Sequence, residues 1–360
     1  MHDFIVVGAG PAGSRFARRA AERGRDVLVF EQGEIGEPLA CSGHVSLDIW
    51  EYVPEAARAD LFQNDIYGAR FHVGGPDTPG EAFYRREVIS NAIDRVGLDR
   101  VLARAASDAG ADVRDGHTVT GVEERPDGVR VTVKGPDGTE RHGARMVVGS
   151  DGPRSRVRAE CGLPEPNEFL HGVLGFDPEP DHRDFVDVHL TVPRFFAWRI
   201  PRGEAGVEYG LGCAPGADVS GRFDDLCTAY GVELERRCSG LIPVGPPDRV
   251  TGRRSLLIGD AAGQTKPFTG GGILYGMRAA DRAADRVDPD RPETLDDYER
   301  AWRADLRNEI RLGRLVRAGY SLPKPLQRVG LRALSGEIGV HMDEPSTLFS
   351  RDQLRALLGR

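Results

Sequence analysis

The sequence predicts an α/β protein with a Rossmann-type nucleotide-binding domain, a second domain built on a β-sheet and a C-terminal helical region. Three observations favour this fold class. A glycine-rich loop at residues 8–13 lies between an apolar strand and a helical segment. Two later loops, at residues 149–152 and 259–263, also follow short apolar strands, and each contains an aspartate. Beyond residue 290, apolar residues recur at helical spacing.

Hydrophobic periodicity and turn residues predict the individual elements. The predicted strands are residues 3–7, 26–30, 119–125, 128–133, 145–149, 185–191, 195–200, 207–213 and 255–258. The predicted helices are residues 12–23, 88–109, 272–286, 293–317 and 325–334, with a last helix after Ser350. The nucleotide-binding domain is expected to comprise residues 1–158, with an insertion of the second domain near 60–85, and residues 246–290. Residues 159–245 then form the second domain, and residues 291–360 form the helical region.

Composition limits the partners and compartments that we expect. The net charge is -8, which argues against a nucleic-acid partner. The five cysteines are odd in number, and no CxxC pair occurs, so we predict neither a disulfide framework nor a metal site. Apolar runs reach only strand length, and Asp3 stands where a signal peptide carries positive charge. We therefore expect a cytoplasmic protein.

The first glycine-rich loop matches the G-x-G-x-x-G pattern of dinucleotide-binding folds. Gly8 permits a tight turn, Gly10 lets a pyrophosphate approach the backbone, and Gly13 lets helix and strand pack closely. Ala12 stands in the first turn of the helix, whose unpaired N–H groups attract phosphate. Glu31, with Gln32 beside it, ends the next strand and is expected to accept hydrogen bonds from a ribose. An ordinary strand–helix turn is the alternative, and the pattern alone does not separate FAD from NAD.

The other two loops point to a second set of ligand contacts. Asp151 and Gly152 follow one predicted strand, and Asp260 and Ala261 follow another. Carboxylates at the carboxyl edge of a parallel sheet lie where ligands bind. A run of three glycines, Gly270, Gly271 and Gly272, leads into a helix at Ile273. That helix start is predicted to stabilise negative charge on a bound ring.

Together these loops, with the segment Asp94-Arg95…Asp99, resemble the flavoproteins of the para-hydroxybenzoate hydroxylase fold. The resemblance covers residues 1 to about 290 and implies FAD as the cofactor. It also implies that Arg95 lies near the flavin or its phosphates. A solvated helix arginine is the alternative for this residue.

Two further segments, residues 38–43 and 193–203, resemble the geranylgeranyl reductase family, which saturates C=C bonds of isoprenoid chains. The resemblance places Cys41 beside the flavin, as a proton donor or positioning group for the alkene. A thiol near its ordinary pKa can hold a proton at neutral pH and release it. Ile200 and His44 depart from the family pattern, which leaves the exact substrate open. Tyr275 is an alternative proton donor, and either residue can instead be simply buried.

The substrate-binding prediction combines an alternating strand with a loop. Phe196, Trp198 and Ile200 alternate, so they share one face and can form an apolar wall for a prenyl chain. Pro267 and Phe268, in the loop before the last glycine run, are expected to line the same space. Plain sheet core is the alternative for the alternating residues.

Three enzyme classes fit this fold at the level of sequence. The first is a reductase of isoprenoid double bonds, with NAD(P)H, ferredoxin or reduced deazaflavin as the electron donor. The second is an FAD monooxygenase of an aromatic or polyketide-like substrate. The third is a flavin-dependent halogenase, because residues 196–201 approach a halogenase pattern; the catalytic lysine of that class has no counterpart, since no lysine precedes Lys134.

The helical region carries a basic stretch. Residues 303–332 hold eight basic residues and only two acidic ones. Apolar residues fall beside the arginines at helical spacing. This pattern predicts peripheral contact with an anionic membrane. The alternative is a helix pair that covers the first domain with its arginines in solvent.

Overall fold

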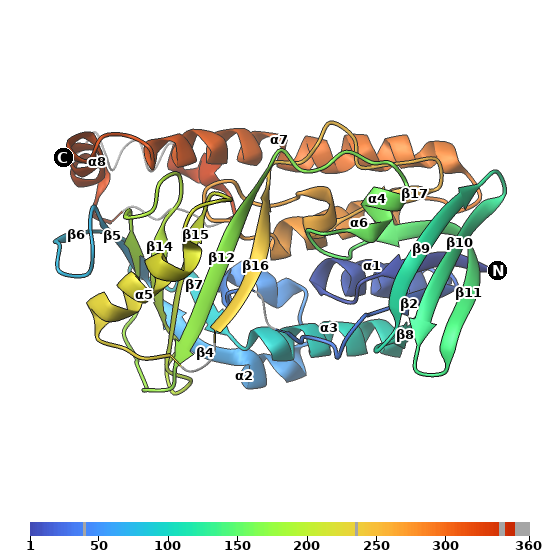
Figure 1. Ribbon diagram of the computed structural model, residues 1–360, viewed down its shortest axis with the longest axis horizontal. Helices are drawn as coiled ribbons and strands as arrows, with labels where there is room; N and C mark the ends of the chain where they lie inside the picture. The colour runs from blue at the N-terminus through green and yellow to red at the C-terminus, as the bar shows by residue number, and fades with distance from the viewer. Residues whose placement is uncertain (39–40, 235–236, 338–342, 350–360) are drawn as a thin grey trace.

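In the computed structural model, residues 1–38, 41–234, 237–337 and 343–349 are described. Figure 1 shows two large sheets side by side along the long axis of the molecule, with one long helix running along both. The first sheet belongs to the nucleotide-binding domain and the second to the domain predicted from residues 159–245. The α/β fold class with a Rossmann-type first domain is confirmed.

The nucleotide-binding sheet has a parallel core in the order β8-β2-β1-β11-β17. Its strands are β8 (Asp112–Arg114), β2 (Val27–Phe30), β1 (His2–Val7), β11 (Gly138–Gly149) and β17 (Ser255–Leu257). Two antiparallel strands, β9 (Thr118–Arg125) and β10 (Gly128–Gly135), extend the sheet through the first half of β11. Helices α1 (Pro11–Ala21), α3 (Arg95–Asp108) and α6 (Ile273–Arg286) pack together beside it. Buried residues of α1 and α6 join the strands in one apolar core, whereas Leu98 and Leu102 of α3 pack with Leu274 and Met277 of α6 in another cluster.

Two element predictions in this domain were wrong in extent. Residues 88–109 do not form one helix, because β7 (Ser90–Ile93) is a strand and α3 begins only at Arg95. The side chain of Asp94 accepts a hydrogen bond from the Val96 N–H at 3.0 Å, which fixes the start of the helix after it. The strand predicted at 145–149 is the end of the longer β11, whose first half pairs with β10.

The second sheet has the order β16-β12-β15-β14-β13-β5-β6. Its strands are β16 (Arg237–Val244), β12 (Glu168–Asp177), β15 (Val207–Cys213), β14 (Ala197–Pro201), β13 (Phe185–His189), β5 (Gly68–His72) and β6 (Gly80–Tyr84). Helix α5 (Val219–Tyr230) covers one face with an apolar cluster. The other face carries a second cluster that includes Phe196, Trp198 and Ile200. A small third sheet joins β3 (His44–Ser46), β7 and β4 (Phe62–Ile66).

The C-terminal region consists of α7 (Leu295–Gly319) and α8 (Lys324–Leu334). The first half of α7 is part of the protein core, since Trp302, Leu306 and Ile310 are buried. The helix predicted after Ser350 lies outside the described residues. The short helices are η1 (Leu47–Glu51), η2 (Glu55–Ala57), α2 (Arg58–Leu61), α4 (Arg156–Glu160), η3 (Gly259–Ala262), η4 (Pro292–Thr294) and η5 (Pro345–Phe349). Among the described residues, no helix has the length and apolar character needed to cross a bilayer.

Candidate functional site

The candidate site lies at the carboxyl edge of the parallel strands. Because β1, β2, β11 and β17 run in the same direction, the loops that follow them meet at one edge. The Ser150 hydroxyl donates to the carbonyls of Val7 and Gly8 at 2.9 and 2.7 Å, which ties the second loop to the first. Glu31 accepts a hydrogen bond from the Ala9 N–H at 2.7 Å. These bonds bring the predicted loops together.

The three glycines of the first loop differ in what surrounds them. Gly8 has a φ of +98°, and a Cβ there would lie 2.4 Å from the Ser150 carbonyl oxygen. A Cβ on Gly13 would lie 2.0 Å from the Gly8 carbonyl oxygen. A Cβ on Gly10 would meet nothing within 4 Å. Gly8 and Gly13 are therefore required for packing, whereas Gly10 keeps space open at the start of α1, as a bound pyrophosphate needs. Ala12 packs against Gly259 and Gly276 and so fixes the distance between the first loop, the third loop and α6.

Glu31 and Asp151 are held differently. Glu31 accepts from the N–H of Ala9 and from that of Gln32, and burial raises the pKa of its carboxyl. Asp151 accepts from the Ser155 hydroxyl at 2.5 Å and from the N–H groups of Arg156 and Val157. One Asp151 oxygen thus accepts the first N–H groups of α4, and the other holds the hydroxyl of the N-cap residue Ser155. That Asp151, Gly152 or Gln32 contacts the cofactor stays a prediction.

The environment of the Asp260 carboxylate differs from that of the hydrogen-bonded Asp151 carboxylate. No hydrogen bond to its carboxylate occurs among the described residues, and burial raises its pKa to about 6, against the opposing effect of Arg95. The Oδ1 atom lies 2.5 Å from the point where a Cβ on Gly272 would stand, directly before Ile273 and α6. Gly272 is the N-cap residue of α6, and no side chain caps the helix there, so the first N–H groups of α6 remain available. A carboxylate and a free helix start are thereby placed together beside Ala261.

Cys41 lies next to the Arg95 side chain. Arg95 is buried and donates to Asp99 at 2.5 Å, while the Cys41 thiol donates to the Ser42 carbonyl at 3.5 Å. Burial is the main cause that raises the pKa of the Cys41 thiol, and the charges of Arg95 and Asp260 also act on it. Residues 39–40 of this segment lie outside the described residues. Cys41, Arg95 and Asp260 therefore belong to one electrostatic group.

Tyr275 is fully buried in α6, and its hydroxyl donates to the Asp343 carbonyl at 2.8 Å. Burial raises the pKa of this hydroxyl well above its ordinary value. Since its proton is directed to a backbone oxygen, Tyr275 has a structural role in this conformation. Its role as a proton donor stays a prediction.

The aromatic residues form a continuous wall on the second sheet. Phe196 stacks on Phe195 with ring centroids 4.4 Å apart and meets Trp198 and Tyr320 edge-on. Ile200 belongs to the same cluster, as the alternation predicted. Pro267 and Phe268 pack against Gly313 of α7, and the Tyr320 hydroxyl donates to the Phe268 carbonyl at 3.0 Å.

The aromatic wall lies in contact with the glycine run that precedes α6. A Cβ on Gly270 would lie 3.1 Å from the Phe195 ring. On the other side, the Trp198 indole donates to Glu208 at 2.9 Å, and Glu208 pairs with Arg202 at 3.0 Å. Arg202 in turn donates to the Ile93 carbonyl at 3.2 Å and lies 3.4 Å from the point where a Cβ on Gly43 would stand. The wall thus borders both the glycine run before α6 and the Cys41 segment.

Sequence reasoning missed two buried ion pairs at this site, Glu208–Arg202 and Lys266–Asp343. The pairing of Glu208 could not be predicted, because in the sequence it is a single polar residue within a predicted strand. Lys266 did give a signal, since it is one of three lysines in the chain and lies between Asp260 and the glycine run.

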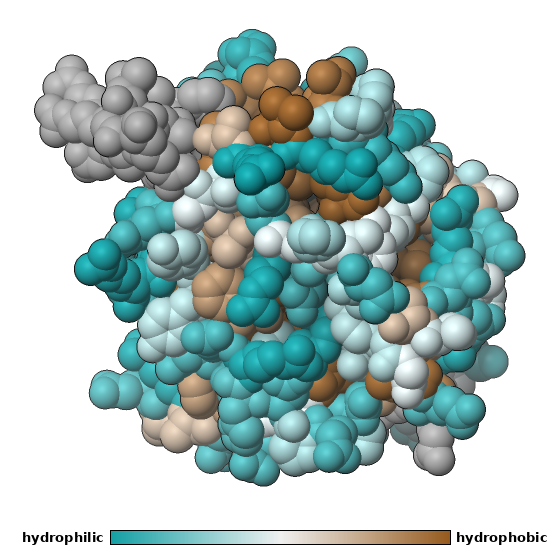
Figure 2. All heavy atoms as spheres, turned by 90° about the vertical axis from the view of Figure 1, so that its left-hand side faces the viewer, coloured by the Kyte–Doolittle hydropathy of each residue, from teal (hydrophilic) through white to brown (hydrophobic). Residues whose placement is uncertain are grey.

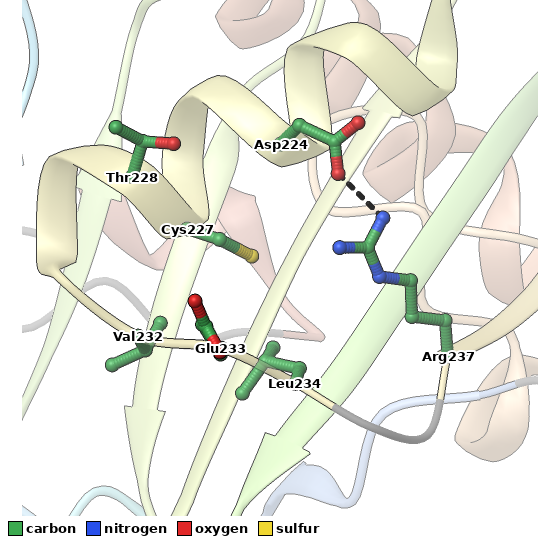
Figure 3. A pocket seen from close by; sticks show the side chains of 7 residues that line it. All are labelled: Asp224, Cys227, Thr228, Val232, Glu233, Leu234 and Arg237. Atoms are coloured by element: carbon green, nitrogen blue, oxygen red, sulfur yellow. Dashed lines mark hydrogen bonds and ion pairs between the residues drawn. The ribbon is translucent and has the colours of Figure 1, made fainter.

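A separate hollow of about 430 Å³ lies between α5 and the segment that follows it (Figure 3). Its lining residues are Asp224, Cys227, Thr228, Val232, Glu233, Leu234 and Arg237. Arg237 pairs with Asp224 across it at 2.5 Å. The hollow lies by α5, on the opposite side of the second sheet from the aromatic wall, and it includes none of the predicted site residues.

Comparison with known families and proteins agrees with this geometry. The family described as "FAD binding domain" matches residues 88–205, and the family "NAD(P)-binding Rossmann-like domain" matches residues 6–36. The digeranylgeranylglycerophospholipid reductase 1 of Methanopyrus kandleri is 31% identical over 344 residues, covering 87% of this chain and 89% of the relative. The digeranylgeranylglycerophospholipid reductase of Methanosarcina acetivorans is 29% identical over 353 residues, covering 88% and 84%.

Among solved structures, a geranylgeranyl bacteriochlorophyll reductase-like protein from Thermoplasma acidophilum has a TM-score of 0.86 at 22% identity, covering 100% of this chain and 97% of the other. The p-nitrophenol 4-monooxygenase of Pseudomonas putida has a TM-score of 0.74 at 17% identity, covering 100% and 97%. A flavin-dependent brominase has a TM-score of 0.67 at 15% identity, covering 92% and 98%. These likenesses are to the fold alone, and only reductases are found among the sequence relatives described above.

Proposed function

This chain belongs to the digeranylgeranylglycerophospholipid reductase family of FAD-dependent oxidoreductases, and we propose that it saturates C=C bonds in the isoprenoid chains of a membrane-lipid precursor. One observation supports the proposal most strongly. Cys41, Arg95 and Asp260 form one group at the sheet edge, and the aromatic wall borders the loops that carry them. The site therefore joins a proton donor, a flavin position and an apolar surface.

The residues at the sheet edge suit the parts of FAD. The space beside Gly10 and the free N–H groups of α1 would receive the pyrophosphate, and Glu31 would bind the adenosine ribose. Asp260 would accept hydrogen bonds from the ribityl chain, and the start of α6 would face the pyrimidine edge of the ring. When bound, FAD supplies the hydride that is added to one carbon of the double bond.

The second carbon needs a proton, for which we propose the Cys41 thiol. Because burial raises its pKa, the thiol keeps its proton at neutral pH until a stronger base forms on the substrate. The positive charge of Arg95 favours the thiolate that remains. Reprotonation from solvent completes the cycle.

An isoprenoid chain offers no polar group near its double bonds, so shape must orient it. Phe196, Trp198 and Ile200 belong to one apolar cluster, and Phe268 is linked to it through Tyr320, whose ring packs on Phe196. The Glu208–Arg202 pair fixes the Trp198 indole, so the wall keeps one position relative to the Cys41 segment. Such positioning supplies much of the rate in reactions of this kind.

An anaerobic experiment tests the reaction. The purified flavoprotein is reduced chemically and mixed with a geranylgeranyl lipid without oxygen. We expect the flavin to reoxidise and the lipid to gain two hydrogen atoms per saturated bond. Cys41→Ala should retain bound FAD and lose this reoxidation. If turnover instead requires O₂ and adds oxygen to the substrate, the protein is a monooxygenase.

The electron donor is proposed only as an external reductant. NAD(P)H, reduced ferredoxin and reduced deazaflavin are to be compared by the rate at which each bleaches the flavin without oxygen. A donor that bleaches the flavin and supports repeated lipid saturation identifies the physiological class. If all three fail although dithionite succeeds, a donor of another class is required.

We also propose that α8 and the end of α7 rest on an anionic membrane. Five large apolar residues are exposed there, and five exposed basic residues lie among them. The apolar residues are Leu315, Leu322, Leu326, Val329 and Leu334, and the basic residues are Arg311, Arg314, Lys324, Arg328 and Arg332. Figure 2 shows apolar residues gathered at the upper end of this face. The large apolar residues earlier in this stretch, Leu306 and Ile310, are buried, so the surface is shorter than the stretch 303–332.

Vesicle flotation tests the membrane surface. The protein should float with vesicles that contain phosphatidylglycerol at low salt, and less with uncharged vesicles. The double substitution Leu326→Ser, Val329→Ser should abolish flotation. Phe62→Ser is the matched control, because Phe62 is an exposed apolar residue on β4, outside this surface. Equal flotation of all three proteins would refute the proposal.

A further inference from the structure

A buried ion pair lies beside the proposed flavin position and has no part in the reaction described above. The Lys266 ammonium donates to Asp343 at 2.6 Å. Lys266 is 6% exposed and Asp343 is 0% exposed. A buried pair of this kind gains little stability over apolar residues, because both charges lose their hydration. Its presence therefore calls for a role other than stability.

The backbone directs this cation toward the start of α6. The Lys266 N–H donates to the Gly271 carbonyl at 3.0 Å, and the Gly270 N–H donates to the Lys266 carbonyl at 2.8 Å. The loop thus closes on itself, and the Lys266 side chain lies against the glycine run. A Cβ on Gly271 would stand 3.1 Å from the ammonium nitrogen. The positive charge consequently lies next to the turn that leads into the free N–H groups of Gly272 and α6.

The charges of Lys266 and Asp343 both act on His44, with opposite effects on its pKa. His44 begins β3, three residues after Cys41, and its ring bonds the Ser90 hydroxyl at 2.8 Å. Burial lowers the pKa of His44 to about 4, and the neighbouring Lys266 charge lowers it as well. His44 is therefore neutral at pH 7 and adds no second positive charge. Lys266 therefore adds a positive charge next to the glycine run, in addition to the Arg95 charge beside Cys41.

We propose that Lys266 stabilises the negative charge that the flavin ring gains on reduction, and that Asp343 limits this effect, so that the pair sets the reduction potential. The proposal rests on the flavin position given above. A fixed cation in a site of low dielectric acts strongly on charge that develops nearby and needs no reorganisation. The start of α6 acts in the same direction. Asp343 opposes both, because it lies within hydrogen-bond distance of the ammonium.

A purely structural role for the pair makes a different prediction. The segment that carries Asp343 has other attachments to the molecule: the Tyr275 hydroxyl bonds the Asp343 carbonyl at 2.8 Å, and the Ser346 N–H donates to Glu309 at 3.0 Å. Asp343→Asn should therefore keep the segment in place. If the pair only fastened this segment, removal of either partner would change the flavin in the same direction.

The test measures the two-electron reduction potential of the FAD-loaded protein without lipid. Lys266→Met should make the reduction equilibrium about tenfold less favourable, which is a decrease of about 30 mV. Asp343→Asn should shift the potential the opposite way by a similar factor. Lys266→Arg, which keeps the charge, should stay near the wild-type value. The double variant Lys266→Met, Asp343→Asn should lie below Asp343→Asn, which tests Lys266 without leaving a buried unpaired carboxylate.

Shifts of the same sign for Lys266→Met and Asp343→Asn, or no shift in either, would overturn the inference. Sulfite affinity of the oxidised flavin is a second readout, since sulfite addition also places negative charge on the ring and should follow the same order of variants. Neither measurement uses a lipid or an electron donor. A failure here therefore leaves the proposed reaction intact, and a failure of lipid reduction leaves the potentials interpretable.

Discussion

Asp260→Asn should stabilise the apoprotein and weaken its hold on FAD. The Asp260 carboxylate has no hydrogen-bond partner among the described residues, and burial raises its pKa to about 6 from an ordinary 3.8. This difference is a factor of about a hundred in proton affinity, or about 3 kcal/mol. Asparagine has nearly the same shape, so it avoids the cost of the buried charge without creating a new contact with Gly272.

The sign of the pH dependence follows from the raised pKa. The folded protein holds the Asp260 proton more tightly than the unfolded chain does, so the favourable contribution is complete below 3.8 and is lost as the pH rises through about 6. At pH 8 the wild type carries the full cost of the charge, and at pH 5 roughly half of it. The advantage of Asp260→Asn should therefore grow from pH 5 to pH 8. The pKa of about 6 already includes the attraction to Arg95, so about 3 kcal/mol is the net gain expected at pH 8.

Urea denaturation of both apoproteins at pH 5 and pH 8 measures this difference, and fluorescence titration measures FAD affinity. We expect a more stable variant with an FAD dissociation constant at least about tenfold higher, because one charge-assisted hydrogen bond is worth about 1.5 kcal/mol or more. A variant that is no more stable than the wild type at pH 8 would show that the carboxylate is adequately solvated. A variant that binds FAD normally would remove Asp260 from the cofactor site.

Four further substitutions test the site. Gly13→Ala should destabilise the apoprotein by about 3 kcal/mol in urea denaturation, because its Cβ would overlap a carbonyl oxygen at 2.0 Å. Gly10→Ala should leave stability within about 1 kcal/mol and lower FAD affinity, because its methyl group enters the ligand space. Lipid-dependent reoxidation of the reduced flavin should persist above pH 9.0 before it falls, because burial raises the pKa of Cys41, and Cys41→Ser should slow it at every pH. Glu208→Gln should cost about 3 kcal/mol, measured in the same denaturation assay, because it leaves Arg202 without its buried counter-charge.

Features encoded within a few neighbouring residues were readable from the sequence. The loop at residues 8–13 combines a strand, fixed glycines and a helix start within a few residues, although Gly8 also makes room for the distant Ser150 carbonyl. The alternation of Phe196, Trp198 and Ile200 likewise placed them on one face, because side-chain direction in a strand depends only on position.

Features that depend on distant partners were not readable. The apolar residues Ile89 and Ile93 have helical spacing with those of α3, yet Ile93 belongs to a strand because β3 and β4 flank it. The strand β5 pairs with β13, more than a hundred residues further along the chain, and nothing in either segment specifies that partner. The role of Lys266 could not be predicted either, because it depends on the ion pair with the distant Asp343.

Asp151, Asp260 and Glu31 all lie at the carboxyl edge of the sheet, but their carboxylates have different hydrogen-bond partners. Asp151 is followed within six residues by a hydroxyl and two N–H groups at the start of α4, so the protein satisfies its carboxylate by itself. After Asp260 the chain forms the short turn η3 instead, and the N–H of Gly263 bonds the Asp260 carbonyl rather than its side chain. The Asp260 carboxylate thus has no hydrogen-bond partner among the described residues, burial raises its pKa, and we propose that it binds the cofactor. Glu31 is intermediate, because it accepts the Ala9 N–H and so fastens the second strand to the first loop. Whether a carboxylate at a sheet edge is structural or binds a ligand is thus decided by the N–H groups that the next few residues can offer it.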